Sequence, residues 1–522
     1  MSKRATFLLL VALFLPLGLA APLAAQEESE PAPAVSAPAS DEAGQARRGA
    51  RREQAESRRL PPAVTTEHQI TIGGETIEYQ AIAGSIVLEG ANGRAEADIA
   101  FVAYFRKGAD PQQRPITFAF NGGPGAASAY LHLGALGPKR LSFGNEGEVP
   151  SSPPVLSDNE ESWLAFTDLV FVDPVGTGFS RFLTDDAEVR RRYWSVEGDI
   201  SALGSFVWRF LNRYDRLASP KALVGESYGG FRVPKLARAL QTRFGVGVGT
   251  LVMISPVLDF ALIEDGPVSP LAPAARLPSF AATALERAGK TVTSRAQLAE
   301  AERYAEGPFL TDFLLGPRDR KARERLIADV TRLTGLDEAL VRRFAGRVDL
   351  TSFVRELHRD RERVGSYYDG NVTALDPDPF AARSEFDDPV LDGSVAPLTS
   401  ASVDYLARAL GYRVDARYHL LNREVSGRWN WGSGRRQPEV LSDLAAVLAL
   451  DGKAQALVVH GFTDLVTPYF SSKLALDQLP ALGSDGARVG LEVLPGGHMF
   501  YTRDTSRRAL KEAVRPLYER VK

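Results

Sequence analysis

The sequence predicts an α/β protein with one mainly parallel central sheet, flanked by helices and interrupted by a helical insertion. From Ile116 onward, short apolar runs alternate with helix-like stretches, as in parallel strands joined by helices. The alternation stops between about residues 265 and 400 and resumes at Ala456, which favours one interrupted sheet over a separate C-terminal domain, the alternative. The apolar runs are residues 116–120, 169–172, 222–224, 251–254, 456–459 and 491–494.

The first 25 residues have the pattern of a signal peptide. A basic pair is followed by the apolar run 7–19 and then by small residues. The run is shorter than the roughly 20 residues that a helix needs to cross a bilayer. We therefore expect cleavage before Gln26 and an exported protein, periplasmic or secreted, with no membrane attachment after cleavage. An uncleaved N-terminal anchor is the alternative.

The next segments differ sharply in composition. Residues 26–63 are rich in Ala, Pro, Glu, Ser and Arg, so they are expected to form a flexible leader. Residues 69–72 and 97–104 alternate between apolar and polar side chains and lie next to the turn signals Gly73-Gly74 and Asn92-Gly93. This pattern predicts antiparallel hairpins at one edge of the sheet.

Two parts of the chain are expected to build the sheet domain. We predict that residues 64–265 and 400–522 form this domain and that residues 266–399 form a helical cap. The chain of 522 residues is 44% apolar, which is enough for a large core, and its net charge of -3 argues against a nucleic-acid partner. It contains no cysteine, which excludes a thiol nucleophile and thiolate metal sites.

A G-x-S-x-G motif at Gly225-Glu226-Ser227-Tyr228-Gly229 is the strongest local signal. It follows the apolar run 222–224 and precedes a helix-like stretch, which is the context of a nucleophile on a strand-to-helix turn. The glycines relieve crowding in that turn, and the helix N-terminus stabilises negative charge. Ser227 is therefore the candidate nucleophile; a chance match in a glycine-rich chain is the alternative.

A nucleophilic serine needs a base and an acid that orients the base. His498 follows the run 491–494 and Asp464 follows the run 456–459, so both are expected at the carboxyl edge of the sheet. The order Ser, Asp, His is that of α/β-hydrolases. His460 is a competing base, and Asp464 could instead be a turn former.

Two backbone N–H groups are expected to form an oxyanion hole. Tyr228 follows the nucleophile and supplies the first, and Gly123 in the loop 120–125 is predicted to supply the second. Phosphate cradling by this loop is the alternative, but the loop lacks the Gly-Lys-Ser/Thr ending of a P-loop.

Several ordered blocks resemble the serine carboxypeptidase family, the S10 peptidases. Residues 120–128 resemble its W-N-G-G-P-G-C-S-S segment, and residues 225–230 its G-E-S-Y-A-G elbow. Residues 496–499 match its G-G-H-M, Asp464 occupies its acid position, and residues 162–163 and 171–180 are similar to its S-W and D-x-P-x-G-x-G-F-S blocks. The resemblance implies an α/β-hydrolase fold and a serine-type carboxypeptidase that needs no metal or organic cofactor.

The resemblance also implies roles in substrate binding. Asn121 and Glu226 would bind the C-terminal carboxylate of a peptide, which requires that one of the two carboxyl groups be protonated and so implies an acidic preference. The family's second glutamate is replaced by Ala135, its disulfides are missing, and its G-N-G segment reads Ile254-Ser255-Pro256.

Three classes of function follow. The first is a carboxypeptidase acting on peptides, and the second is an esterase or acyltransferase that uses the same triad on a small acyl substrate, which Ala135 favours. The third is a catalytically silent binding protein. The sequence indicates neither the oligomeric state nor the residue preference at the scissile bond. The segments 367–369 and 429–431 are candidate lining of the substrate pocket.

Overall fold

The computed structural model describes most of the unit Arg51–Lys522. The described residues are 56–143, 153–266, 268–382, 385–434, 436–479 and 488–519. The predicted signal peptide and most of the predicted leader lie outside them. Within the described residues, no helix is both long and apolar enough to span a membrane.

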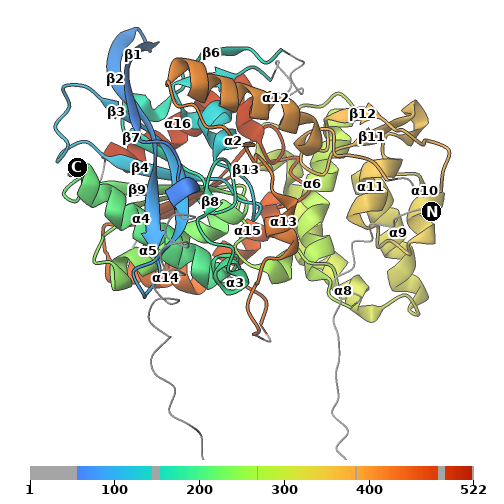
Figure 1. Ribbon diagram of the computed structural model, residues 1–522. Helices are drawn as coiled ribbons and strands as arrows, with labels where there is room; N and C mark the ends of the chain where they lie inside the picture. Colours follow the sequence, from blue (N-terminus) through green and yellow to red (C-terminus); the bar gives the residue numbers. More distant parts are fainter. Residues whose placement is uncertain are drawn as a thin grey trace, which may run out of the picture. The chain divides into compact units, whose positions relative to one another are not determined.

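A ten-stranded sheet organises this unit (Figure 1). Its main path runs β1-β2-β3-β7-β4-β9-β10-β13-β14, and β8 pairs with β3. The strands from β1 to β7 along this path pair antiparallel, whereas β7, β4, β9, β10, β13 and β14 are all parallel. The bounds are β1 Val64–Ile72, β2 Glu75–Glu89, β3 Ala95–Arg106, β4 Ile116–Phe120, β7 Asp168–Val172, β8 Arg181–Phe182, β9 Lys221–Glu226, β10 Thr250–Ile254, β13 Gln455–Gly461 and β14 Val489–Leu494. The predicted parallel strands and the antiparallel edge are both confirmed.

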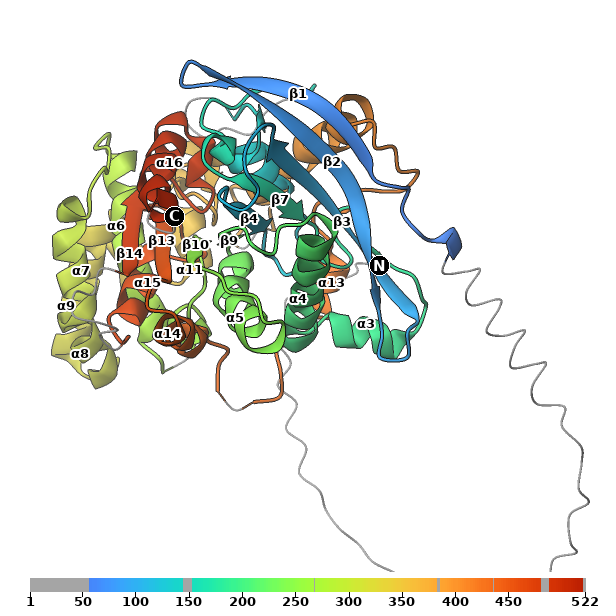
Figure 2. The ribbon, with the colours of Figure 1, turned by 90° about the vertical axis from the view of Figure 1, so that its left-hand side faces the viewer.

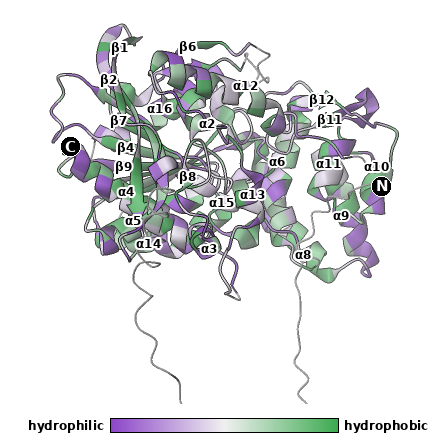
Figure 3. Ribbon diagram, in the orientation of Figure 1, coloured by the Kyte–Doolittle hydropathy of each residue, from purple (hydrophilic) through white to green (hydrophobic). Residues whose placement is uncertain are grey.

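Helices cover both faces of the sheet (Figure 2). One face packs against α4 (Val196–Arg213), α5 (Tyr228–Arg243) and α14 (Leu441–Leu450), and the other against α2 (Ala129–Leu131), α12 (Leu391–Asp404) and α16 (Asp504–Glu519). On the first face, the Phe210 ring of α4 lies edge-on to Phe101 and Phe118. Figure 3 shows apolar residues concentrated in the central strands, as expected for strands buried on both faces.

The predicted insertion is largely helical. Its elements are α6 Leu271–Arg287, α7 Ala299–Glu306, α8 Pro308–Leu315, α9 Arg320–Thr334, α10 Glu338–Arg343, α11 Leu350–Glu356 and the short strands β11 Arg363–Gly365 and β12 Thr373–Leu375. Phe280 and Phe353 stack in a core that continues into Tyr469 and Phe470 of α15 (Tyr469–Leu476). The insertion therefore shares its core with the segment that follows β13. The predicted boundary at 399/400 falls inside α12, so this helix connects the two regions.

The last residues of the predicted leader pack against the sheet. Leu60 is 7% exposed, and its N–H donates to Asp98 Oδ2 at 2.9 Å. Arg58 forms an ion pair with Asp185 at 2.6 Å. A buried leucine and a buried hydrogen bond order this stretch, so the flexible leader cannot extend to residue 63.

Candidate active site

The candidate site residues follow five neighbouring parallel strands at their carboxyl ends. Asn121 follows β4, Ser227 follows β9, Ser255 follows β10, Asp464 lies beyond β13, and His498 lies beyond β14. Parallel strands end at a common edge, so residues up to 377 positions apart meet there. This edge is where the sequence predicted the site.

The turn that carries Ser227 is strained. Ser227 has φ 60° and ψ -125° between β9 and α5, and its N–H donates to the Ile254 carbonyl at 2.9 Å. A Cβ atom at Gly225 would lie 2.0 Å from the Gly229 carbonyl oxygen. The first glycine of the motif is therefore required by close backbone approach, and the turn lifts Ser227 out of the sheet.

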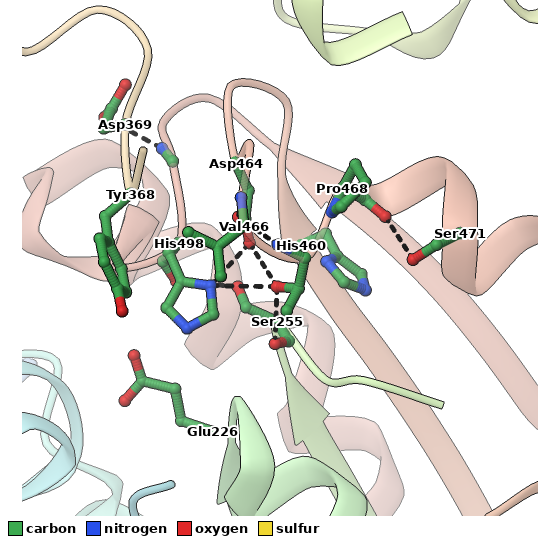
Figure 4. Close-up of polar contacts among 12 residues, drawn as sticks. Glu226, Ser255, Tyr368, Asp369, His460, Asp464, Val466, Pro468, Ser471 and His498 are labelled. Atoms are coloured by element: carbon green, nitrogen blue, oxygen red, sulfur yellow. Dashed lines mark hydrogen bonds and ion pairs between the residues drawn. The ribbon is translucent and has the colours of Figure 1, made fainter. Parts of the chain in front are cut away.

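His498 and Asp464 form a buried pair, with Nδ1 of the histidine 2.8 Å from Oδ2 of the aspartate (Figure 4). The other carboxylate oxygen accepts hydrogen bonds from the N–H groups of Val466 and Thr467, at 3.0 and 2.9 Å. The Thr467 hydroxyl lies 2.7 Å from Oδ2. Asp464 is thus held as an acceptor, so it fixes the His498 tautomer with the proton on Nδ1 and leaves Nε2 as the base.

The electrostatics of His498 suit a base. Burial lowers its pKa, but the Asp464 and Glu226 carboxylates more than compensate, so the pKa lies above its ordinary value. In the described part of the chain, the His498 ring makes hydrogen bonds through Nδ1, to Asp464 and Thr467, and none to the Ser227 hydroxyl. Catalytic hydrogen bonds often tighten only when substrate binds.

The loop after β4 lies directly against the nucleophile turn. A Cβ atom at Gly122 would be 2.6 Å from the Tyr228 nitrogen, so only glycine allows this approach. Gly123 is exposed and has φ +103°. Among the described residues, the N–H groups of Gly123 and Tyr228 have no acceptor. The two predicted donors are therefore on adjoining segments and available to a ligand.

Glu226 is buried in a polar cluster beside His498. It is 3% exposed, the Asn121 amide donates to its Oε2, and the Tyr501 hydroxyl lies 2.8 and 2.9 Å from its two oxygens. The Asn121 side-chain oxygen accepts from the Leu131 N–H at 2.9 Å, which directs the amide nitrogen toward Glu226. Burial raises the pKa of Glu226 to about 7, against the opposing effects of His498, Tyr501 and Asn121.

Three residues of this site were missed in the sequence. Tyr501 contacts Glu226, and Thr467 contacts Asp464. Ser255, at φ 44°, donates through its hydroxyl to the His498 carbonyl at 2.8 Å, and its own carbonyl lies 3.0 Å from the Thr467 hydroxyl. Their signal was weak: Tyr501 and Thr467 each stand three residues after a candidate catalytic residue, and Ser255 directly follows the apolar run 251–254.

Other candidates occupy different places. His460 pairs with Ser472 at 2.8 Å, and burial lowers its pKa to about 4. The rings of Trp429 and Trp431 pack edge-on against the Tyr228 side chain, at 5.3 and 5.4 Å. The Tyr368 ring lies edge-on to His498 at 5.3 Å. Of the two predicted lining segments, the one at 367–369 is thus beside the candidate base.

Comparison with known proteins finds one family. Residues 91–247 match the serine carboxypeptidase family, Peptidase_S10. The pheromone-processing carboxypeptidase kex1 of Aspergillus niger is 36% identical over 166 residues, 30% of this chain and 24% of that protein. Serine carboxypeptidase-like 13 of Arabidopsis thaliana is 28% identical over 169 residues, 31% of this chain and 37% of that protein. The chain thus spans less than two fifths of the length of these relatives.

A solved structure shows the same fold. The crystal structure of a prohormone-processing carboxypeptidase from Saccharomyces cerevisiae, Kex1(delta)p, aligns with 84% of this chain and 91% of its own, with a TM-score of 0.55 and 16% identity. Together with the parallel sheet and its helices, this confirms the predicted α/β-hydrolase fold.

Proposed function

Because residues 91–247 match the serine carboxypeptidase family, we propose that this protein is a serine-type carboxypeptidase that removes C-terminal residues from peptides. The observation that carries the proposal is the shared edge at which the strained Ser227, the His498–Asp464 pair and the buried Glu226 cluster lie. A nucleophile alone is common to many hydrolases. The Glu226 carboxyl group next to the nucleophile can be protonated, and in that form it can bind a substrate that ends in a carboxylate.

In the proposed mechanism, His498 takes the proton of Ser227 through Nε2 as the hydroxyl attacks the last peptide carbonyl. The N–H groups of Gly123 and Tyr228 stabilise the oxyanion, and Asp464 stabilises the imidazolium. His498 then protonates the departing amine, which leaves an acyl-enzyme on Ser227. Water activated by His498 hydrolyses this ester and regenerates the serine. No step requires a metal or an organic cofactor.

The substrate carboxylate is proposed to bind at Asn121 and Glu226. With its pKa raised to about 7, Glu226 is protonated below neutrality and can donate a hydrogen bond to the carboxylate. Above neutrality the ionised Glu226 repels it, so KM for peptides with a free C-terminus rises with pH. The acidic preference expected from the resemblance thus extends nearly to neutral pH.

An esterase or acyltransferase is the second candidate, and Ala135 favours it. This position, in the segment Ala135-Leu136-Gly137-Pro138, would hold a second glutamate in a typical family member. Here Glu226 instead has Tyr501 and Asn121 as partners, neither of which carries a charge. An acyl-enzyme on Ser227 could also form from an ester and transfer to an alcohol or amine.

Two further proposals concern the whole chain. We propose that residues 1–25 direct export, to the periplasm or outside the cell, and are then removed. We also propose that residues 266–399 act as a cap on the catalytic domain of residues 64–265 and 400–522. Phe470, which belongs to the catalytic domain, lies in the same hydrophobic core as the apolar side chains of the insertion, and this supports the arrangement.

Product analysis of the mature protein tests the function. Free and C-terminally amidated peptides, incubated with the wild-type protein and Ser227→Ala at pH 5 to 8, are followed by mass spectrometry. Stepwise loss of C-terminal residues from the free peptides alone, reduced about 10⁴-fold or more in the variant, is expected. Cleavage of simple esters without cleavage of peptides would instead assign the esterase or acyltransferase function.

A further inference from the structure

A segment of the insertion reaches both loops that carry the candidate base and acid. This segment, residues 366–371, includes the buried Asp369, which is 7% exposed. Asp369 Oδ2 accepts the N–H of Gly497 at 3.0 Å, one residue before His498. Its Oδ1 accepts the hydroxyl of Thr463 at 2.8 Å, one residue before Asp464. A single carboxylate therefore joins the immediate neighbours of both residues.

The backbone of the same segment adds further contacts. The Tyr368 carbonyl accepts the N–H of His498 at 2.5 Å, and the Gly370 N–H donates to the Thr463 carbonyl at 3.0 Å. Figure 4 shows Tyr368 and Asp369 on a segment of the chain beside His498. The Glu226 carboxylate lies below the histidine and the tyrosine. The segment thus contacts the His498 loop and the Asp464 loop with main chain as well as side chain.

Two further groups donate to the Asp369 carboxylate. Arg503 donates to Oδ2 at 2.7 Å, and the Asn371 N–H donates to Oδ1 at 3.1 Å. Charge-assisted hydrogen bonds of this kind are stronger and more directional than neutral ones. Replacing the carboxylate by an amide removes one acceptor and points an N–H group at these donors.

The segment is itself anchored from the insertion side. Asp388 accepts the Ser366 hydroxyl at 2.7 Å and the Tyr367 N–H at 2.8 Å. It also accepts the N–H groups of Val390 and Leu391, both at 2.9 Å. Because Asp388 fixes the beginning of the segment, Asp369 has a defined position from which to hold the two loops.

We propose that Asp369 is a positioning residue that holds the His498 and Asp464 loops in register and so makes the insertion part of the catalytic centre. The inference rests on the triad of the proposed function but not on the choice of a peptide substrate. Asp369 touches neither the nucleophile nor the reacting atoms. It acts by keeping Nδ1 of His498 on Asp464, so that Nε2 stays directed at the nucleophile.

The test compares Asp369→Asn with Asp312→Asn in the full mature chain. Asp312 is a matched control, since it is also a buried carboxylate of the insertion, 4% exposed, and is paired with an arginine, Arg325, at 2.5 and 3.0 Å. Its partner belongs to α9, away from the catalytic loops. Both variants are measured at a temperature at which circular dichroism shows them folded.

Two measurements report on positioning without a peptide substrate. The first is the rate at which a small fluorophosphonate labels Ser227, which requires an oriented His498. The second is the downfield proton resonance of the His498 Nδ1–H bonded to Asp464. In Asp369→Asn, labelling should slow by about 10²-fold, the cost of roughly 1 Å of misplacement, and the resonance should broaden or vanish. In Asp312→Asn, both should match the wild-type protein.

The opposite outcomes overturn the inference. Wild-type labelling and an intact resonance in Asp369→Asn would show that the residue only stabilises the fold. Equal losses in both variants would show that the insertion responds to any buried charge change. Failure of the proposed function is distinguishable, because the wild-type protein would then fail to cleave free peptides while its Ser227 still reacts with the fluorophosphonate.

Discussion

The two halves of the candidate triad are held by different means. Ser227 is placed by backbone geometry, in a turn where Gly225 and Gly122 allow main-chain atoms to approach closely. His498 and Asp464 are placed by side-chain hydrogen bonds: the Thr467 and Ser255 hydroxyls bond to them directly, and the Asp369 carboxylate accepts from their neighbours Gly497 and Thr463. The first half thus depends on close main-chain packing, and the second depends on side-chain groups that come from several segments of the chain.

This difference indicates how each half responds to mutation. Backbone approach leaves no room for an added atom, so a small increase in volume on the nucleophile side should be severe. A hydrogen-bond network spreads the support over several groups, so removing one hydroxyl on the base side should have a smaller effect. Mutations that affect only the Ser227 turn or only the His498–Asp464 pair therefore test this difference.

Of the three variants that test this comparison, Gly225→Ala is expected to have the largest effect. The added Cβ would lie 2.0 Å from the Gly229 carbonyl oxygen, so the turn must open and Ser227 must move. We expect kcat to fall by about 10²-fold and unfolding free energy to fall by about 2 kcal/mol. Gly247→Ala is the control, because an added Cβ there meets nothing within 4 Å. Steady-state kinetics and urea unfolding measure both; a fully active Gly225→Ala would contradict the backbone account.

A smaller effect is expected on the base side from Thr467→Val. This change keeps the shape but removes the hydroxyl that lies 2.7 Å from Asp464 Oδ2. We expect kcat to fall about tenfold with KM unchanged, since the contacts of this hydroxyl with Asp464, His498 and the Ser255 carbonyl are lost together. Thr334→Val controls for the loss of a buried hydroxyl, which here donates to Val330 in α9. A loss as large as that of Gly225→Ala would remove the contrast between the two halves.

The smallest effect is expected from Tyr501→Phe, as a change in pH dependence. The Tyr501 hydroxyl stabilises ionised Glu226, so its removal should raise the pKa of Glu226 further above about 7. Protonated Glu226 then persists to higher pH, and the rise of KM for free-carboxylate peptides should move up by about one pH unit. Tyr518→Phe, which removes a buried hydroxyl bonded to Thr117, should leave the profile unchanged. A downward movement would show that Tyr501 does not act on Glu226.

Much of the sheet was predictable because apolar runs report burial directly. The run 222–224 lies within β9 and the run 251–254 within β10. The residues that follow these two strands, Ser227 and Ser255, lie at the carboxyl edge of the sheet. The helical character of residues 266–399 was also predicted, and this region contains α9. The packing of Leu60 against the sheet could not be predicted, because a single leucine in a polar segment gives no periodic pattern.

The sequence by itself determined which candidate catalytic residues follow which strands along the chain. A serine stands in a glycine-flanked turn, and an aspartate and a histidine come after later strands. Only the tertiary structure decided which side chains support them. Tyr501 on Glu226, Ser255 on His498 and Asp369 across both loops are contacts between residues that are up to 275 positions apart. The physical reason is that motif spacing encodes local backbone geometry, whereas hydrogen bonds at the shared edge depend on how separate segments pack.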